Sequence, residues 1–159
     1  MSDAADVRPG TDRLLLDVML GKLAVYLRMC GYDAADAGDR GVEADDRLRR
    51  LAAAEDRRLL TRDRALAART DGAVLLTEQD VVDQLAELRT AGFALALDET
   101  PARCGRCNGA VEAVPPGAPT PDYAPSPAAT DCWRCPDCGQ VFWKGSHWDR
   151  VARALERSR

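Results

Sequence analysis

The sequence predicts an α/β fold in which a parallel sheet carries helices on both faces, followed by a small cysteine-rich module. Three observations lead to this prediction. Short apolar runs alternate with helical patterns through residues 13–100, as they do in parallel sheets with helical crossovers. Seven of the nine prolines then fall between residues 101 and 129, where apolar periodicity is absent. One C-x-x-C pair lies at the start of this proline-rich stretch and a second follows it.

The first two strand and helix pairs follow from local patterns. Three consecutive leucines predict a buried strand at 14–16, and apolar residues at i, i+3, i+4 and i+7 predict a helix over 20–27. A second strand at 32–35 leads into a loop rich in glycine and aspartate. The next helix is predicted to begin there, with Asp45 or Asp46 as its N-cap.

The same alternation continues to residue 100. A strand at 58–61 precedes a short helix at 64–69, and a strand at 73–77 precedes a helix whose apolar face runs through 81–88. A last strand is predicted at 93–97. After the proline-rich stretch, a final helix is predicted over about 148–155.

Acidic residues gather at one edge of the predicted sheet. A helix that returns over a parallel sheet begins at the carboxyl edge of the strands, where ligands bind in open α/β sheets. The acids expected at this edge are Asp17, Asp36, Asp39, Asp45, Asp46 and Asp63. Glu55 lies about ten residues along the helix, roughly 15 Å away, and is excluded.

Carboxylates that converge without partners repel one another, and a divalent cation removes that cost. Mg²⁺ and Mn²⁺ take carboxylate and water oxygens as ligands, and such ions promote phosphodiester cleavage. The arrangement therefore predicts a magnesium or manganese site. The alternative for each acid taken alone is a helix N-cap.

The four flanking cysteines predict a structural zinc site. Cys104-Gly-Arg-Cys107 and Cys135-Pro-Asp-Cys138 supply four thiolates, the tetrahedral set that structural zinc prefers. The ion would provide folding energy that the proline-rich stretch cannot supply by hydrophobic burial. Cys132 also stands in C-x-x-C spacing with Cys135, but lacks the Pro and Gly of a knuckle turn, so it is expected to be a spectator.

Aromatic and basic residues interleave near the C-terminus. Trp143, Lys144, His147 and Trp148 are candidates to stack bases and hold phosphates. The alternative is that the tryptophans pack the small module against its neighbour, and the sequence favours neither reading. His147 is the only histidine, which excludes a pair of histidines as catalysts or ligands.

Charge and composition limit the partners and the location. The formal net charge of −4 argues against a purely electrostatic coating of nucleic acid. No apolar run approaches the roughly 18 residues of a membrane span. Clustered cysteines suit a reducing compartment, so a cytoplasmic protein is expected. The predicted organisation is a flexible N-terminus at 1–12, an α/β domain at 13–100 and a cysteine-rich module with a C-terminal helix at 101–159.

Three motifs resemble the Mut-7 C-terminal RNase family, a PIN-like nuclease domain followed by a zinc ribbon. They are D-x-M-L-G-K-L-A at 17–24, L-L-T-R-D at 59–63 and F-W-x-G-S-H-W at 142–148, and the resemblance covers about residues 13–155. Tyr26 stands where such sequences usually carry tryptophan, and Cys132 is an additional thiol.

The resemblance implies a PIN-like three-layer fold and metal-dependent ribonuclease activity on RNA. It places Asp17 and Asp63 on the strand-end acids of the family and Asp45 or Asp46 on its helix-opening acid, as catalytic ligands of Mg²⁺ or Mn²⁺. Lys22 and Arg62 lie within the matching motifs and are expected to contact substrate, together with the C-terminal aromatic and basic residues. The competing hypothesis is a module without turnover that binds RNA or protein.

Overall fold

Four parallel strands form the central sheet of the structure, a computed structural model that describes residues 7–159. Their order across the sheet is β2-β1-β3-β4. The strands are β1 (Arg13–Leu16), β2 (Asp33–Asp36), β3 (Arg57–Thr61) and β4 (Val74–Leu75). In the register, Leu16 lies opposite Asp36 on β2 and Leu60 on β3, so three strands end side by side.

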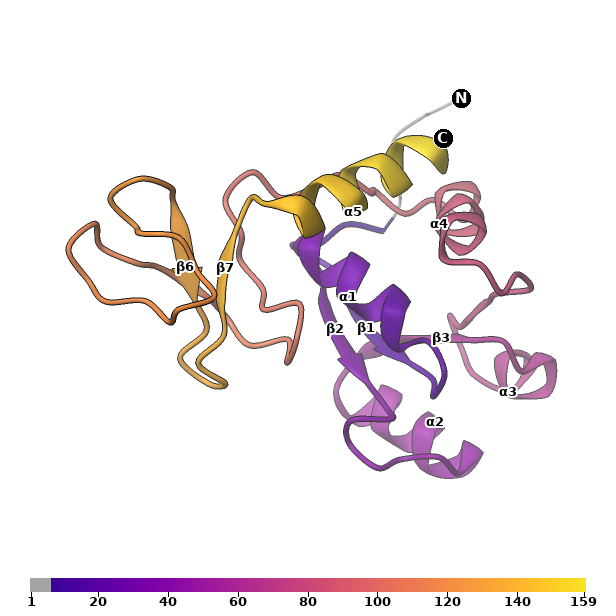
Figure 1. Ribbon diagram of the computed structural model, residues 1–159. Helices are drawn as coiled ribbons and strands as arrows, with labels where there is room; N and C mark the ends of the chain where they lie inside the picture. The colour runs from indigo at the N-terminus through magenta and orange to yellow at the C-terminus, as the bar shows by residue number, and fades with distance from the viewer. Residues whose placement is uncertain (1–6) are drawn as a thin grey trace.

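Helices cover both faces of this sheet (Figure 1). One face packs against α1 (Gly21–Met29), α4 (Val81–Thr90) and α5 (Ser146–Arg157), and the other packs against α2 (Asp45–Ala54) and α3 (Arg64–Ala68). Alternation along β1 explains the division, because Leu14 and Leu16 belong to the first core and Leu15 to the second. The predicted α/β class, with a parallel sheet between two helical layers, is confirmed.

The strand predicted at 93–97 is wrong. Phe93 and Leu95 are buried, but the segment forms only an isolated parallel bridge between Phe93 and Val7. Its backbone is engaged elsewhere, since the Tyr32 hydroxyl donates to the Ala94 carbonyl at 2.7 Å and the Asp98 N–H donates to Met29. These bonds replace the ladder that a fifth strand would need.

The expected flexible N-terminus is only partly described. Residues 1–6 lie outside the described residues. Residues 7–12 pack on the domain, because Val7 is buried and its N–H donates to the Gly92 carbonyl at 3.0 Å. Burial of the apolar Val7 side chain therefore holds this segment on the domain, although the neighbouring residues are polar.

The predicted N-cap of α2 is also wrong. Ala44 occupies the cap position, and its side chain offers no oxygen to the helix. Asp45 and Asp46 instead lie in the first turn, where negative charge interacts favourably with the positive end of the helix dipole.

The cysteine-rich module is a small antiparallel sheet of β5 (Glu112–Ala113), β6 (Cys132–Arg134) and β7 (Val141–Trp143). Its core is a cluster of Val114, Cys132 and Val141. The proline-rich stretch folds over this cluster through Tyr123, whose hydroxyl accepts the Val141 N–H at 3.1 Å. So small a core agrees with the prediction that the module needs another source of stability.

Polar contacts fix the module against the α/β part. The Asn108 side chain accepts the Ala34 N–H at 2.9 Å and donates to Asp33 at 2.7 Å, which attaches the first knuckle to the edge strand β2. Arg28 on α1 donates to the carbonyls of Gly105 and Arg106. Helix α5 then returns to the α/β core through Val151, Ala154 and Leu155, although it follows the module in the chain. The division of the chain at residue 100 stays a prediction.

Asp33 is the charged centre of this contact, and its removal is expected to destabilise the protein. Burial by itself raises its pKa, but hydrogen bonds from Arg57 and Asn108 outweigh burial and lower the pKa to about 2. Asp33→Asn should therefore cost about 2 kcal/mol of unfolding free energy at pH 7. Because the folded-state pKa is depressed, this stabilisation is lost as the pH falls from about 4 towards 2. Urea denaturation across that range measures the effect.

Asp131→Asn, at an exposed position in the module, is the matched control for the Asp33 variant. It should leave stability within about 0.5 kcal/mol of the wild type. An Asp33 variant as stable as this control at pH 7 would contradict the assigned role.

None of the helices within residues 7–159 has the length and apolar character needed to cross a membrane.

Candidate functional site

The four predicted zinc cysteines converge on one point of the module. Sγ of Cys104 lies 3.7 Å from Sγ of Cys138, and Sγ of Cys107 lies 3.5 Å from Sγ of Cys135. All four sulfurs lie within 4.8 Å of one another. A tetrahedral ion with Zn–S bonds of about 2.3 Å separates its sulfurs by about 3.8 Å, so these residues fit zinc.

Tight turns deliver the sulfurs to that point. The turn after Cys104 closes through an Asn108 N–H that donates to the Cys104 carbonyl at 2.8 Å, and the turn after Cys135 closes in the same way through Gly139 at 2.7 Å. Both closing residues have positive φ, at 72° and 80°. Glycine and asparagine tolerate this conformation, which explains the turn formers that follow each C-x-x-C pair.

Cys132 is not part of the cluster. It is buried in the small core, and its sulfur lies 3.3 Å from the Thr130 carbonyl. Within residues 7–159, the cysteines whose sulfurs could hold an ion are the four of the two knuckles, and Cys132 is not among them.

A buried threonine joins two of the predicted catalytic acids at the carboxyl edge of the sheet. The Thr61 hydroxyl donates to the Asp17 carboxylate at 2.7 Å and accepts the backbone N–H of Asp63 at 3.0 Å. Asp17 also accepts the Val18 N–H at 2.8 Å. The Asp63 carboxylate accepts the Leu66 N–H at 3.1 Å and so caps α3. Adjacent strand ends thus place Asp17 and Asp63 on either side of one hydroxyl.

A third acid, Asp36, ends the neighbouring strand β2. It lies between two glycines, because a Cβ on Gly21 would be 3.4 Å, and one on Gly38 would be 3.3 Å, from its carboxylate oxygens. Burial raises its pKa, and the charge of Asp39 acts in the same direction. A cation bound nearby would relieve both effects. Asp36 shares the edge, as the sequence predicted, but did not enter the predicted ligand set.

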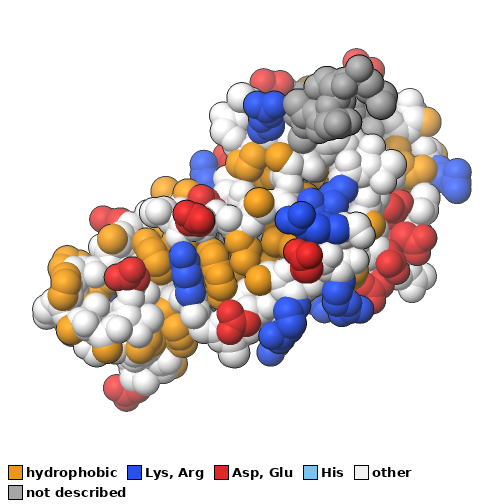
Figure 2. All heavy atoms as spheres, turned by 90° about the horizontal axis from the view of Figure 1, so that it is seen from above, with side chains coloured by type: hydrophobic (Ala, Val, Ile, Leu, Met, Phe, Trp, Pro, Cys, Tyr) orange, Lys and Arg blue, Asp and Glu red, His pale blue; other side chains and the backbone are white. Residues whose placement is uncertain are grey.

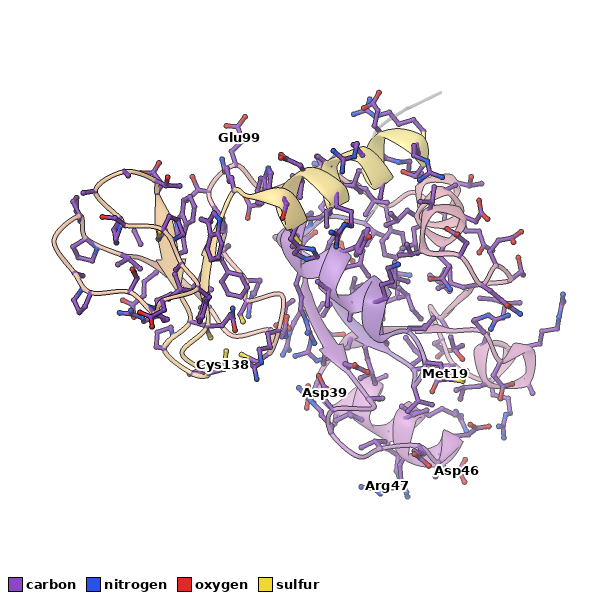
Figure 3. The ribbon with its side chains drawn as sticks, in the orientation of Figure 1. Met19, Asp39, Asp46, Arg47, Glu99 and Cys138 are labelled. Atoms are coloured by element: carbon purple, nitrogen blue, oxygen red, sulfur yellow. The ribbon has the colours of Figure 1, made fainter. Side chains whose placement is uncertain are left out.

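The helix-opening acids, Asp45 and Asp46, have contacts of their own, apart from Asp17, Asp36 and Asp63. The Asp45 carboxylate pairs with Arg69 at 3.3 Å, and this ion pair would compete with a cation for Asp45. Asp46 is exposed, with Arg49 at 3.9 Å. Figure 3 shows Met19, Asp39 and Asp46 around the lower side of the α/β part, the side on which β2 ends.

The acids do not form a closed cluster. Across the part of the chain that the structure describes, the cysteines are the only group of three or more His, Cys, Asp or Glu residues with ligand atoms within 4.8 Å of one another. The carboxylates of the sheet edge are therefore spaced more widely than a single preformed cation site requires. Glu55 pairs with Arg40 and Arg57, and Arg57 begins β3 at the opposite edge.

Sequence reasoning did not select Thr61, although the L-L-T-R-D motif contains it. Its side chain is completely buried, and among residues 7–159 it alone forms hydrogen bonds with both Asp17 and Asp63. A polar residue directly after the two buried leucines of β3 was the available signal.

Replacing Thr61 with valine keeps its shape and removes the hydroxyl. Thr61→Val should lower the unfolding free energy by about 1 kcal/mol, because it leaves a partly buried N–H and a carboxylate oxygen without their partner. It should also weaken the binding of a divalent ion at this edge about tenfold in a Mn²⁺ titration, because the Asp17 side chain is no longer held in place. Thr61→Ser keeps the hydroxyl and should retain most of both properties. Equal losses in the two variants would show that the hydroxyl is not what matters.

The loop between β1 and α1 carries an unusual residue beside Asp17. Met19 has an apolar side chain that is 91% exposed, and its φ is 76°. Both the exposed apolar side chain and the left-handed backbone conformation cost free energy. Lys22, in the first turn of α1, and Arg62, directly before Asp63, are both exposed, and both follow the carboxyl ends of strands. Lys22 and Arg62, the two predicted substrate contacts, are therefore accessible to solvent at the edge that carries the acids.

The predicted aromatic and basic contacts gather at a different place. Trp143, His147 and Trp148 line a cavity between the module and α1, and Nζ of Lys144 lies 5.0 Å from the centre of a Trp148 ring. Burial and the charge of Arg150 lower the pKa of His147. Trp143 also stacks on Tyr123 with ring centres 6.2 Å apart. Trp143 therefore packs within the module and also borders a cavity, and base stacking by the tryptophans stays a prediction.

Comparison with known proteins agrees with this arrangement. The family model described as the Mut7-C RNAse domain matches residues 12–155, nearly the whole chain. No curated protein and no solved structure matches the chain. The matched region includes the four cysteines and every acid of the sheet edge. The chain therefore belongs to the Mut7-C RNAse domain family.

Proposed function

We propose that this protein is a metal-dependent ribonuclease that hydrolyses phosphodiester bonds at the carboxyl edge of its sheet. The observation that carries the proposal is the pairing of Asp17 and Asp63 across Thr61 at adjacent strand ends, in a chain of an RNase family. Asp36 supplies a further carboxylate from β2, and Asp45 or Asp46 completes the set once it is released from its arginine.

The residues at this edge suit a hard divalent cation. Carboxylate oxygens are preferred ligands of Mg²⁺ and Mn²⁺. Bound there, such an ion supplies activation of water and neutralises charge on the cleaved phosphate. Thr61 holds Asp17 in one orientation, and the exposed Lys22 and Arg62 offer positive charge to the RNA backbone. Zinc, in contrast, is proposed to be structural, because four cysteines leave it no open position.

A cytoplasmic location is part of the proposal. Four cysteines whose sulfurs face one another at 3.5 to 3.7 Å bind zinc only as free thiolates, which a reducing compartment maintains.

A cleavage assay tests the proposal directly. The zinc-loaded protein is incubated with 5′-labelled RNA in the presence of Mg²⁺, of Mn²⁺ or of no added divalent ion, and products are separated on a denaturing gel. We expect products only with an added ion, because the carboxylates cannot activate water alone.

A module that binds RNA or protein without turnover is the second candidate. It is favoured by the spacing of the acids, since no three carboxylates among the described residues lie within 4.8 Å. RNA affinity with no product under any of the three conditions would support this candidate and reject the ribonuclease.

A further inference from the structure

A cavity of about 510 Å³ lies between α1 and the zinc module. Its walls come from both parts of the molecule, with Val25, Arg28 and Met29 on one side and residues of the first knuckle, β7 and the start of α5 on the other. Its volume is within the range of about 300 to 1,000 Å³ that small-molecule sites occupy. Figure 2 shows a band of hydrophobic side chains where the two parts meet, with a basic side chain set among them.

The cavity presents flat aromatic surfaces. Trp143 and Trp148 both line it, and neither is fully buried. The chain at Gly145 passes so close to the first ring that a Cβ there would lie 2.6 Å from the Trp143 indole nitrogen. Glycine at this turn therefore lets Trp143 keep its place at the cavity. Aromatic rings of this kind stack on nucleobases of any sequence.

The cavity is also cationic. Arg28, Arg103 and Arg106 line it, and the described lining residues include neither Asp nor Glu, although the whole chain has a net charge of −4 and Arg103 pairs with Asp33 at 3.7 Å outside the lining. A lining without acids in an acidic protein indicates an anionic ligand.

Arg28 is built into this lining as a fixed cation. It is only 3% exposed, and its Nε and Nη1 donate to the carbonyls of Ala34, Gly105 and Arg106 at 2.8, 3.0 and 3.3 Å. Its Nη2 has no hydrogen-bond acceptor among the described residues. The guanidinium is thus oriented by backbone oxygens and keeps donor capacity for a ligand.

We propose that this cavity binds one unpaired nucleotide of single-stranded RNA. The base lies against Trp143 and Trp148, and the backbone phosphate is held by Arg28 and Arg106. A ligand with a planar base and an anionic phosphate contacts both the aromatic rings and the arginines of the lining. A duplex cannot enter in this way because its bases stay stacked inside the helix. The choice of RNA rests on the proposed function, whereas none of the acids of the sheet edge lines the cavity.

Binding of a labelled strand tests the inference without cleavage. Fluorescence anisotropy follows a 5′-labelled oligouridine of about 12 nucleotides, a length within the usual site sizes of single-strand binders. The full zinc-loaded chain is used without added Mg²⁺ or Mn²⁺. Trp148→Leu and Arg106→Gln should each raise the Kd about tenfold, because they remove a stacking surface and a phosphate contact.

Arg157→Gln is the matched control for Arg106→Gln. It makes the same charge change at an exposed position near the end of α5 and should stay within about twofold of the wild-type Kd. Zinc content and melting temperature are measured for every variant, so that a weakened strand affinity is not confused with an unfolded module.

Three outcomes would overturn the inference. They are wild-type affinity in both cavity variants, equal affinity for a duplex of the same length, and equally tight binding of free uridine monophosphate with the same sensitivity to the variants. The inference and the proposed function can fail separately. Strand binding that needs Trp148 and Arg106, without cleavage under any divalent ion, rejects the nuclease alone. Cleavage with unaltered strand affinity in both variants rejects the cavity alone.

Discussion

Asp17→Asn is expected to lower metal-dependent RNA cleavage about 100-fold or more while the protein keeps its fold. The amide oxygen of asparagine can still accept the Thr61 hydroxyl and the Val18 N–H, which lie 2.7 and 2.8 Å from the Asp17 carboxylate. The variant loses the negative charge, and that charge is what a hard divalent cation requires. Initial cleavage rates over a Mn²⁺ titration, with a melting curve for each protein, measure both properties.

The matched control makes the same substitution at the opposite edge of the sheet. Asp71 is exposed in the turn after α3, and Asp71→Asn should cleave at the wild-type rate. An Asp17 variant that is as active as this control would remove the acidic edge from the mechanism.

Parallel variants of the helix-opening acids identify the remaining ligand. Asp45→Asn breaks an ion pair with Arg69, and Asp46→Asn changes an exposed side chain. Only the variant whose acid holds the cation should require more Mn²⁺ for half-maximal activity. If neither does and Asp36→Asn does, the third carboxylate comes from β2.

Loss of zinc is expected to have the largest effect on stability. Cys135→Ser removes one of four thiolates, and the module has only a cluster of Val114, Cys132 and Val141 to replace the folding energy of the ion. We expect zinc content to fall well below one ion per chain. Hydrogen exchange should increase through β5, β6 and β7, because these strands are short and depend on the knuckles.

The effect should spread to the α/β part through Arg28 and Asn108. Both bind the first knuckle to α1 and β2, so its loosening leaves the buried Arg28 without two of its acceptors. Burial raises the pKa of the Cys104 thiol to about 12, so zinc binding releases protons and zinc is lost as the pH falls.

Cys132→Ser provides the control, because Cys132 is also a buried thiol of the module but lies outside the sulfur cluster. It should keep one zinc ion per chain. Full zinc content in Cys135→Ser would disprove the four-cysteine site, and zinc loss in Cys132→Ser would mean that the ligands had been assigned wrongly.

Local patterns in the sequence were sufficient for most of the fold. The leucines of β1, the helical periodicity of α1 and the spacing of the cysteines each depend on near neighbours in the chain, and near neighbours determine strands, helices and knuckle turns. The segment at 93–97 shows where this reasoning stops. Its apolar side chains are buried as expected, but its backbone bonds to Val7 and Tyr32 instead of a strand.

The candidate site, like the fold, could be predicted from the sequence only in part. The sequence by itself determined that Asp17 and Asp63 end strands and that four cysteines can bind zinc, because strand direction and ligand spacing are properties of short segments. Only the tertiary structure decided that Thr61 joins the two acids and that Arg69 holds Asp45. It also decided that Arg28 meets the tryptophans of the module across a cavity. Such contacts join residues distant in the chain, and their partners are chosen by how the layers pack.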